Sequence, residues 1–88
     1  MEINLSVLEI RLLLKCYESL LSRSYMAQLY RKYNKKIREE AIANLISQGL
    51  IIAQEMPKAG ANKTPIFYKI TNKGQKWVDY YNKNYPNL

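Results

Sequence analysis

The sequence contains no histidine, and this absence removes much of the chemistry that small enzymes use. Histidine is the usual general base near neutral pH and the commonest metal ligand. The adjacent acids Glu39 and Glu40 do not replace it, because neighbours on a helix point about 100° apart and do not form a facing pair. The three glycines form no glycine-rich phosphate loop. We therefore expect a protein that is not an enzyme and that uses no cofactor.

Cysteine is nearly absent as well, and no apolar run has the length of a membrane span. The single Cys16 can form neither an internal disulfide nor a zinc site by itself. It lies within an apolar helical pattern, which favours a buried small side chain, with a disulfide between two molecules as the alternative. The N-terminal residues Met1-Glu2-Ile3 lack the basic segment of a signal peptide. The sequence thus predicts a cytoplasmic protein that does not enter a membrane.

Positive charge is plentiful, and it is confined to two segments. The net charge is +7. Residues 23–38 contain six basic residues and no acid, and residues 56–76 contain five basic residues and no acid. Every other segment sums to zero or below, so these two segments hold the whole excess. Localised positive charge is the electrostatic pattern expected of a nucleic-acid binder.

The length predicts one domain spanning residues 1–88, beginning with a helix from Ser6 to about Ser22. Ser6-Val7-Leu8-Glu9 matches a capping box, in which the serine and the glutamate each bond the other's backbone amide. The apolar face of this helix is broad, with Leu8 and Leu12 at its margin. It is consistent with a central core helix, and also with a helix that lends one edge to a dimer interface.

Two short helices joined by a tight connection are predicted next, which makes this stretch a candidate helix-turn-helix. Ser24 is expected to cap the first, and Tyr33-Asn34 to end it, because asparagine tolerates left-handed backbone. The second is expected from about Lys35 to Gln48, with Gly49 as its stop. Its apolar residues recur at helical spacing: Ile37, Ala41, Ile42, Leu45 and Ile46.

The exposed face of the second helix is the predicted reading surface. In a helix-turn-helix, the N-terminal part of this helix enters the major groove. Basic residues at a helix N-terminus oppose the macrodipole, which favours DNA binding over an ordinary solvated face. Its glutamates would repel phosphates, although a glutamate can accept a hydrogen bond from cytosine N4. The residues expected outward or at the first turn are Lys35, Lys36, Arg38, Glu39, Glu40, Ala43, Asn44 and Ser47.

A hairpin and a last helix complete the chain. Strands are expected at 50–56 and 66–70, joined by the turn-rich residues 57–65, which carry Lys58 and Lys63. These lysines would reach the DNA backbone or minor groove if the tip is a wing; a plain surface loop would look similar. Thr71 is expected to cap a helix over 72–84. Its apolar residues, with those of the first helix, form the expected dimer interface: Leu8, Leu12, Trp77, Tyr80, Tyr81 and Tyr85.

The eight tyrosines suggest base stacking, as in single-strand binders, but most fall within core-like or helical packing patterns. Tyr25 is the exception. It stands at a predicted helix start and is suited to contact a DNA phosphate, and its neighbours Arg23 and Ser24 are expected to bind DNA as well.

The order of elements, and two short motifs, resemble a known family. Residues 45–51, Leu-x-x-x-Gly-Leu-Ile, are similar to the end of recognition helices in MarR- and PadR-type regulators. Residues 68–74, Tyr-Lys-Ile-Thr-Asn-Lys-Gly, are similar to the end of their wing. The composition and small size resemble compact winged-helix proteins of thermophilic archaea and their viruses and plasmids. Where the family has an apolar residue eleven positions before Gly49, this chain has Arg38, and Ile37 is expected to fill that place through a shift of one residue.

The resemblance implies a mostly helical α+β fold, the winged helix-turn-helix, with three helices, a two-stranded wing and a C-terminal helix. It also implies a homodimer that binds double-stranded DNA as a transcription regulator, with residues 35–48 in the major groove and 57–65 on the backbone or minor groove. If the chain is encoded by a virus or plasmid, it would act in the host cytoplasm. A non-specific architectural or chromatin protein, and a winged helix used only for protein association, are the alternatives. The family's effector pockets have no short motif, so no small-molecule effector follows.

Overall fold

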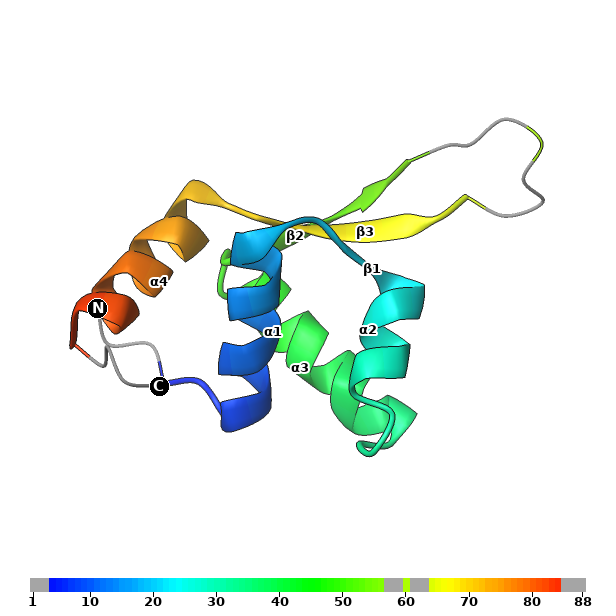
Figure 1. Cartoon of the computed structure of the whole chain (residues 1–88), viewed down its shortest axis with the longest axis horizontal. Coiled ribbons are helices and arrows are strands. Elements are labelled where there is room, and N and C mark those ends of the chain that lie inside the picture. The colour runs from blue at the N-terminus through cyan, green and yellow to red at the C-terminus, as the bar shows by residue number, and fades with distance from the viewer. Residues whose placement is uncertain (1–3, 57–59, 61–63, 85–88) are drawn as a thin grey trace.

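The computed structural model describes residues 4–56, 60 and 64–84. In order, they form α1 (Val7–Glu18), β1 (Leu21–Ser22), α2 (Arg23–Leu29), α3 (Lys35–Ser47), β2 (Ile51–Glu55), β3 (Ile66–Ile70) and α4 (Asn72–Asn84). The sheet runs along one side of α1, α2 and α3, α4 lies at one end, and the β2–β3 hairpin extends beyond α2 at the other (Figure 1). The predicted α+β class, mostly helical, is confirmed. No helix in the described ranges is long and apolar enough to cross a membrane.

The first helix begins where the sequence predicts and ends earlier. Ser6 Oγ accepts a hydrogen bond from the Glu9 amide at 3.2 Å, and Glu9 Oε1 accepts one from the Ser6 amide at 2.8 Å. This is the predicted capping box, and it satisfies two free backbone donors. α1 stops at Glu18 because Leu21 and Ser22 pair with β3 as a short strand, in which Leu21 is buried. The prediction that the helix continues to Ser22 is therefore wrong.

Neither Ser24 nor Asn34 serves the helix end that the sequence predicted for it. Ser22, not Ser24, caps α2, and its Oγ accepts from the Tyr25 amide at 3.0 Å. Asn34 does not end α2 in left-handed backbone; its φ is −69°, and its Oδ1 accepts from the Ile37 amide at 2.8 Å as the cap of α3. Serine and asparagine are both good N-caps, so residue type alone does not decide which helix end each one serves.

The end of α3 follows the predicted glycine stop. Gly49 has a φ of 75°, which suits glycine because no Cβ clashes there. The Gly49 amide donates to the Ile46 carbonyl at 2.9 Å, and the Leu50 amide donates to the Leu45 carbonyl at 3.0 Å. This pair of bonds is a Schellman motif, which satisfies the last carbonyls of the helix. It turns the chain directly into β2, whose first residue Ile51 is fully buried.

The sheet has three strands in the order β1-β3-β2, all antiparallel. Tyr68 on the central strand pairs with Leu21 on one side and with Ala53 on the other. The hairpin of β2 and β3 is as predicted. The sequence did not predict β1, because two residues carry no periodic signal, and only the pairing with β3 makes them a strand.

The start of α4 is fastened to the end of α3. Thr71 Oγ1 accepts from the Gly74 amide at 3.0 Å, which is the predicted cap, and donates to the Gly49 carbonyl at 2.6 Å. Lys73 Nζ donates to the Gln48 carbonyl at 2.7 Å. α4 therefore supplies partners to carbonyls at the C-terminus of the third helix, where a positive charge also complements the helix dipole.

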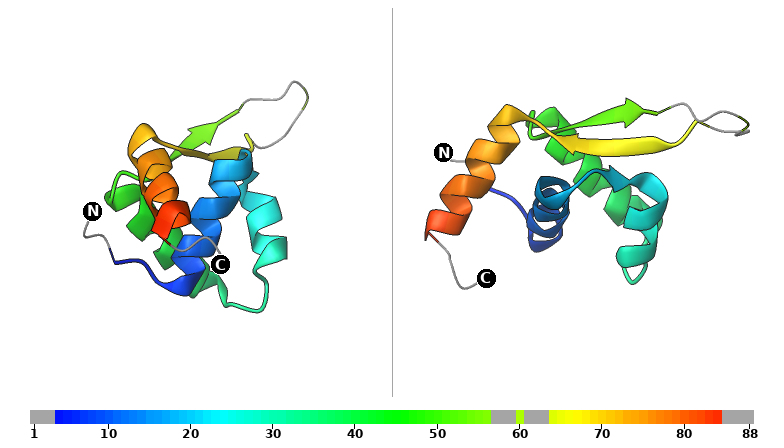
Figure 2. Two further views of the ribbon diagram at one scale, coloured as in Figure 1. Left: turned by 60° about the vertical axis from the view of Figure 1, so that its left-hand side comes forward. Right: turned by 45° about the horizontal axis from the view of Figure 1, so that its top comes forward.

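The central-core alternative for the first helix is confirmed. Leu12 is fully buried and Leu8 is 6% exposed, since α1 packs against α3, α4 and β3. Trp77 is equally buried, and the half-buried ring of Tyr81 stacks on it at 5.2 Å. The prediction that Leu8, Leu12 and Trp77 form an exposed dimer interface is therefore wrong, because these side chains are already covered within one copy. Tyr80 stays exposed. The two helices lie beside each other, as the views in Figure 2 show for α4 and α1.

Cys16 belongs to the same core, as predicted, and is 4% exposed. Burial raises the pKa of its thiol to about 12, which leaves it protonated and unreactive near neutral pH. Within the described ranges, no three side chains of histidine, cysteine, aspartate or glutamate come together as a metal site.

Candidate nucleic-acid interface

The connection between α2 and α3 is held by Arg38. Its guanidinium donates to the carbonyls of Tyr33 and, at 3.5 Å, of Tyr30. Carbonyls after a helix end lack helical partners, and a guanidinium with several donors satisfies them well. Arg38 is thus half-buried in the turn, rather than aimed at DNA as the sequence predicted. Ile37 is 44% exposed, so the predicted shift of one residue does not occur and Arg38 itself fills the position.

The predicted outward face of α3 is exposed at most of its positions. They are Lys35, Lys36, Glu39, Glu40 and Ala43, and the same holds for Ser47 near the end of the helix, which makes six in all. Their opposite side, formed by Ala41, Ile42 and Leu45, is buried in the core. Burial of one side fixes the rotation of the helix, so the other side is presented to solvent.

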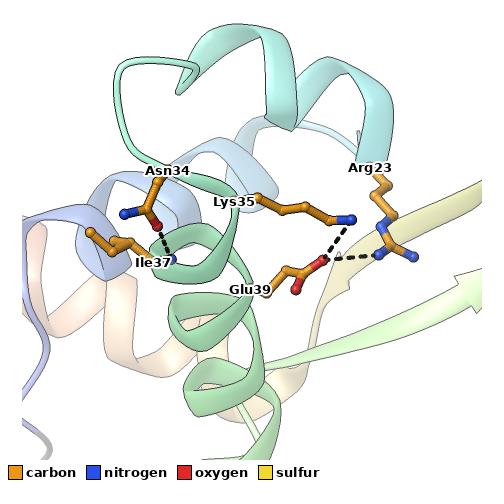
Figure 3. Close-up of polar contacts among 5 residues, drawn as sticks. All are labelled: Arg23, Asn34, Lys35, Ile37 and Glu39. Carbon is orange, nitrogen blue, oxygen red and sulfur yellow. Dashed lines mark hydrogen bonds and ion pairs between the residues drawn. The ribbon is translucent and has the colours of Figure 1, made fainter.

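At the edge of this face, the carboxylate of Glu39 forms ion pairs with two basic side chains. Glu39 Oε1 lies 3.4 Å from Arg23 Nη2 at the start of α2, and 3.9 Å from Lys35 Nζ one turn earlier on α3 (Figure 3). The three side chains are about half exposed or more, so the pairs contribute little to stability. Their effect is to place two positive groups from different helices beside each other.

Ser24 and Tyr25 come next to Arg23 on α2, and both are exposed, Tyr25 by 52%. They follow Arg23 in the first turn, because Ser22 caps the helix just before them. The two hydroxyls and one guanidinium are donors of the kind that contact phosphate oxygens.

The outward orientation predicted for Asn44 is wrong. Its Nδ2 donates to Glu9 Oε2 at 2.6 Å, and Glu9 is only 8% exposed. Glu9 therefore uses one oxygen to cap α1 and the other to hold α3. The sequence showed the capping box but could not show this second contact, which joins residues 35 positions apart.

Asn44→Ala is expected to lower the free energy of unfolding by about 1–3 kcal/mol, because a buried carboxylate loses its partner. Preference among DNA sequences is expected to stay unchanged. Urea denaturation measures the first quantity, and binding to selected and random duplexes measures the second. Ala43→Ser, on the exposed neighbour, is the control and is expected to change stability little. Lost preference with full stability would show that Asn44 contacts a base.

The second basic segment is divided between two parts of the fold. Lys69 lies exposed on β3, whereas Lys73 and Lys76 belong to α4. The hairpin pairing continues one step past the strands, with the Met56 amide donating to the Pro65 carbonyl at 3.0 Å. The predicted wing lysines, Lys58 and Lys63, lie outside the described residues, as does Tyr85.

A surface hollow of about 450 Å³ lies between the start of α1 and the start of α3. Its lining includes Val7, Tyr33 and Ile37, together with Glu9 and Glu40. No basic side chain lines it among the described residues, so the hollow does not extend the basic surface. Nothing in the sequence pattern indicated it, because its walls come from two helices that are distant along the chain.

No protein-family model matches this sequence, and no curated protein sequence matches it. Two solved structures are similar in fold. The transcriptional regulator BldR from Sulfolobus solfataricus superposes with a TM-score of 0.71 at 23% identity over 93% of this chain. The adhesin competence repressor AdcR from Streptococcus pyogenes superposes with a TM-score of 0.66 at 11% identity over 97% of this chain.

The matched region spans 56% of the BldR chain and 69% of the AdcR chain. At these identities, the likeness concerns the fold. The order of elements, the three-stranded sheet and both superpositions agree with the sequence resemblance. The described chain therefore has the winged-helix fold seen in these transcriptional regulators.

Proposed function

We propose that this protein binds duplex DNA and regulates transcription, as a binding protein rather than an enzyme. The observation that carries the proposal is the shared surface of α2 and α3, where Arg23, Lys35 and Lys36 are exposed together. The similarity in fold to two transcriptional regulators supports it. The site of action would be the cytoplasm, where the DNA of a cell without a nucleus lies.

In this proposal, the part of the exposed α3 face formed by Lys36, Glu39 and Ala43 enters the major groove, whereas Glu40 lines the hollow beside α1. Lys36 and Ala43 lie on the side of α3 opposite the core, and the small Ala43 allows close approach. Arg23, with its neighbours on α2, contacts the backbone on one side. The hairpin, with Lys58 and Lys63, contacts the backbone or minor groove on the other.

The affinity for any duplex is expected to fall steeply with salt, because bound phosphates release their counterions. About five phosphate contacts per protomer contribute about −4 to −5 to the slope of a plot of log affinity against log salt, so a bound dimer is expected to give about twice that slope. Lys58→Ala is expected to weaken binding to all sequences alike and to reduce the slope by about 1 per protomer, because this lysine is proposed to contact the DNA backbone. Lys83→Ala is the matched control, since it removes the same charge from the far end of α4. Fluorescence anisotropy at several salt concentrations measures both.

The same titration separates the proposal from its alternatives. Equal affinity for every sequence at fixed salt would indicate an architectural or chromatin protein. Absence of binding at low salt would indicate a winged helix used for protein association. A preference for particular genomic fragments is the result expected of a regulator.

We also propose that the protein acts as a homodimer, as a single winged helix contacts few base pairs. With Leu8, Leu12 and Trp77 inside the fold, the available apolar surface on α1 and α4 is different from the predicted one. Tyr80 is 49% exposed on α4, and Tyr17 is 43% exposed on α1. Tyr17 also donates a hydrogen bond to Asp79 at 3.1 Å, which connects the exposed sides of α1 and α4.

A further inference from the structure

Glu39 stands on the proposed DNA surface, where a carboxylate opposes the approach of phosphates. It is nevertheless held in place there by Arg23 and Lys35, from two different helices. Resting on the proposed function of duplex DNA binding, we propose that Glu39 determines sequence specificity by accepting a hydrogen bond from N4 of a cytosine in the major groove.

The geometry leaves one oxygen of this carboxylate open. Both cations contact Oε1 (Figure 3), and in the part of the chain that the structure describes Oε2 has no hydrogen-bond or ion-pair partner. The side chain is 49% exposed, and it belongs to the second turn of α3. That is the part of a recognition helix that reaches base edges.

The two basic side chains reduce the electrostatic repulsion between the Glu39 carboxylate and the DNA phosphates. A guanidinium has five N–H donors, and Arg23 directs Nη2 at Glu39. Its remaining donors can reach a phosphate at the same time, so Arg23 can join the DNA backbone to Glu39. The Lys35 ammonium has three donors and can be shared in the same way. The ion pairs thus orient Oε2 while they compensate its charge.

Base chemistry then selects cytosine. In the major groove, guanine presents the acceptors O6 and N7, which repel a carboxylate. Adenine presents a donor beside the acceptor N7, and thymine presents an acceptor and a methyl group. Cytosine presents the N4 amino donor without an acceptor next to it, and a glutamate oxygen is its usual partner.

Glu40 provides a matched control on the same helix. It is exposed like Glu39 and has the same charge, but it lines the hollow beside Val7 and Tyr33. It makes no ion pair among the described residues. A change at Glu40 therefore alters the net charge of α3 equally without touching the Arg23–Glu39–Lys35 group.

The experiment selects binding sites from a library of random DNA duplexes with the full chain, using wild type, Glu39→Gln and Glu40→Gln. Wild type and Glu40→Gln are expected to select a cytosine at the same position of the site. Glu39→Gln is expected to lose that preference by on the order of tenfold and to favour adenine there, because glutamine pairs with adenine N6 and N7. Affinity for random duplexes is expected to rise for both variants, since each removes one negative charge.

Thermal unfolding followed by circular dichroism is expected to be the same for all three proteins, because these glutamates are exposed. Retention of the cytosine by Glu39→Gln would overturn the inference. So would wild-type binding without any sequence preference, although DNA binding itself would then stand. If wild type binds no duplex at low salt, the proposed function fails, and the inference fails with it.

Discussion

Alanine in place of Gly74 is expected to lower the free energy of unfolding by about 2 kcal/mol, although alanine is the better helix former. A Cβ at this position would lie 2.2 Å from the Leu50 carbonyl oxygen and 2.7 Å from Ile70 Cγ1. The gain in helix propensity is about 1 kcal/mol. Overpacking of this kind costs about 3 kcal/mol, since the carbonyl belongs to the backbone and cannot rotate away. Urea denaturation measures this change in the free energy of unfolding, and the dependence of that free energy on urea concentration is expected to stay unchanged.

Gln75→Ala is the control for this change. Gln75 is the exposed neighbour in the same helical turn, and its replacement is expected to leave stability nearly unchanged. If Gly74→Ala instead stabilised the protein, α4 would have to lie farther from Leu50 and Ile70 than the structure places it. The result would also test the fastening of α4 to the end of α3, because Thr71 and Lys73 begin the same helix.

Leu12→Glu is expected to prevent folding altogether. Leu12 is fully buried, and an unpaired carboxylate inside a core costs several kcal/mol or more. The whole stability of a domain is only about 5–15 kcal/mol. The far-ultraviolet circular dichroism spectrum of the variant is expected to be that of an unfolded chain without a cooperative transition. A folded Leu12→Glu protein would contradict the central position of α1.

Tyr80→Glu is the matched partner of that experiment, because the same charge is placed on the exposed side of α4. It is expected to leave the fold intact and to produce monomers in sedimentation. Affinity for a duplex with two half-sites is then expected to fall by on the order of a hundredfold. A monomer binds one half-site alone, whereas the two protomers of a dimer bind both half-sites together. Tyr80→Phe, which keeps the apolar ring, is expected to behave as wild type. A monomeric wild type at tens of micromolar would contradict the proposed dimer.

Local sequence patterns were sufficient for much of the fold. The Ser6–Glu9 capping box, the Gly49 stop and the β3 strand lie where the sequence predicted them. Each depends on residues within about six positions of one another, so short-range steric and hydrogen-bonding preferences specify it. The charge pattern likewise indicated the surface of α2 and α3, because residues 23–38 carry six basic residues and no acid.

Local patterns could not decide which of two suitable residues takes a structural role. Ser22 and Ser24 are both suitable caps, and the pairing of β1 with β3 places Ser22 at the helix start. Similarly, the breadth of the apolar face on α1 indicated that this face is buried. It did not indicate whether other elements of the same copy or a second copy cover it. The packing of α3, α4 and β3 around α1 decided that Leu12 belongs to the core of one copy.

In the candidate site, too, the sequence determined some features and the tertiary structure decided others. The sequence by itself determined which residue types stand on α3, including the lysines of its first turn and the two adjacent glutamates. Only the tertiary structure decided their roles, as it turned Arg38 onto the α2–α3 carbonyls, Asn44 onto Glu9 and Glu39 between Arg23 and Lys35. The physical reason is that a polar side chain bonds the nearest suitable partner in space. For Asn44 that partner lies 35 residues away, and for Glu39 the guanidinium lies 16 residues away.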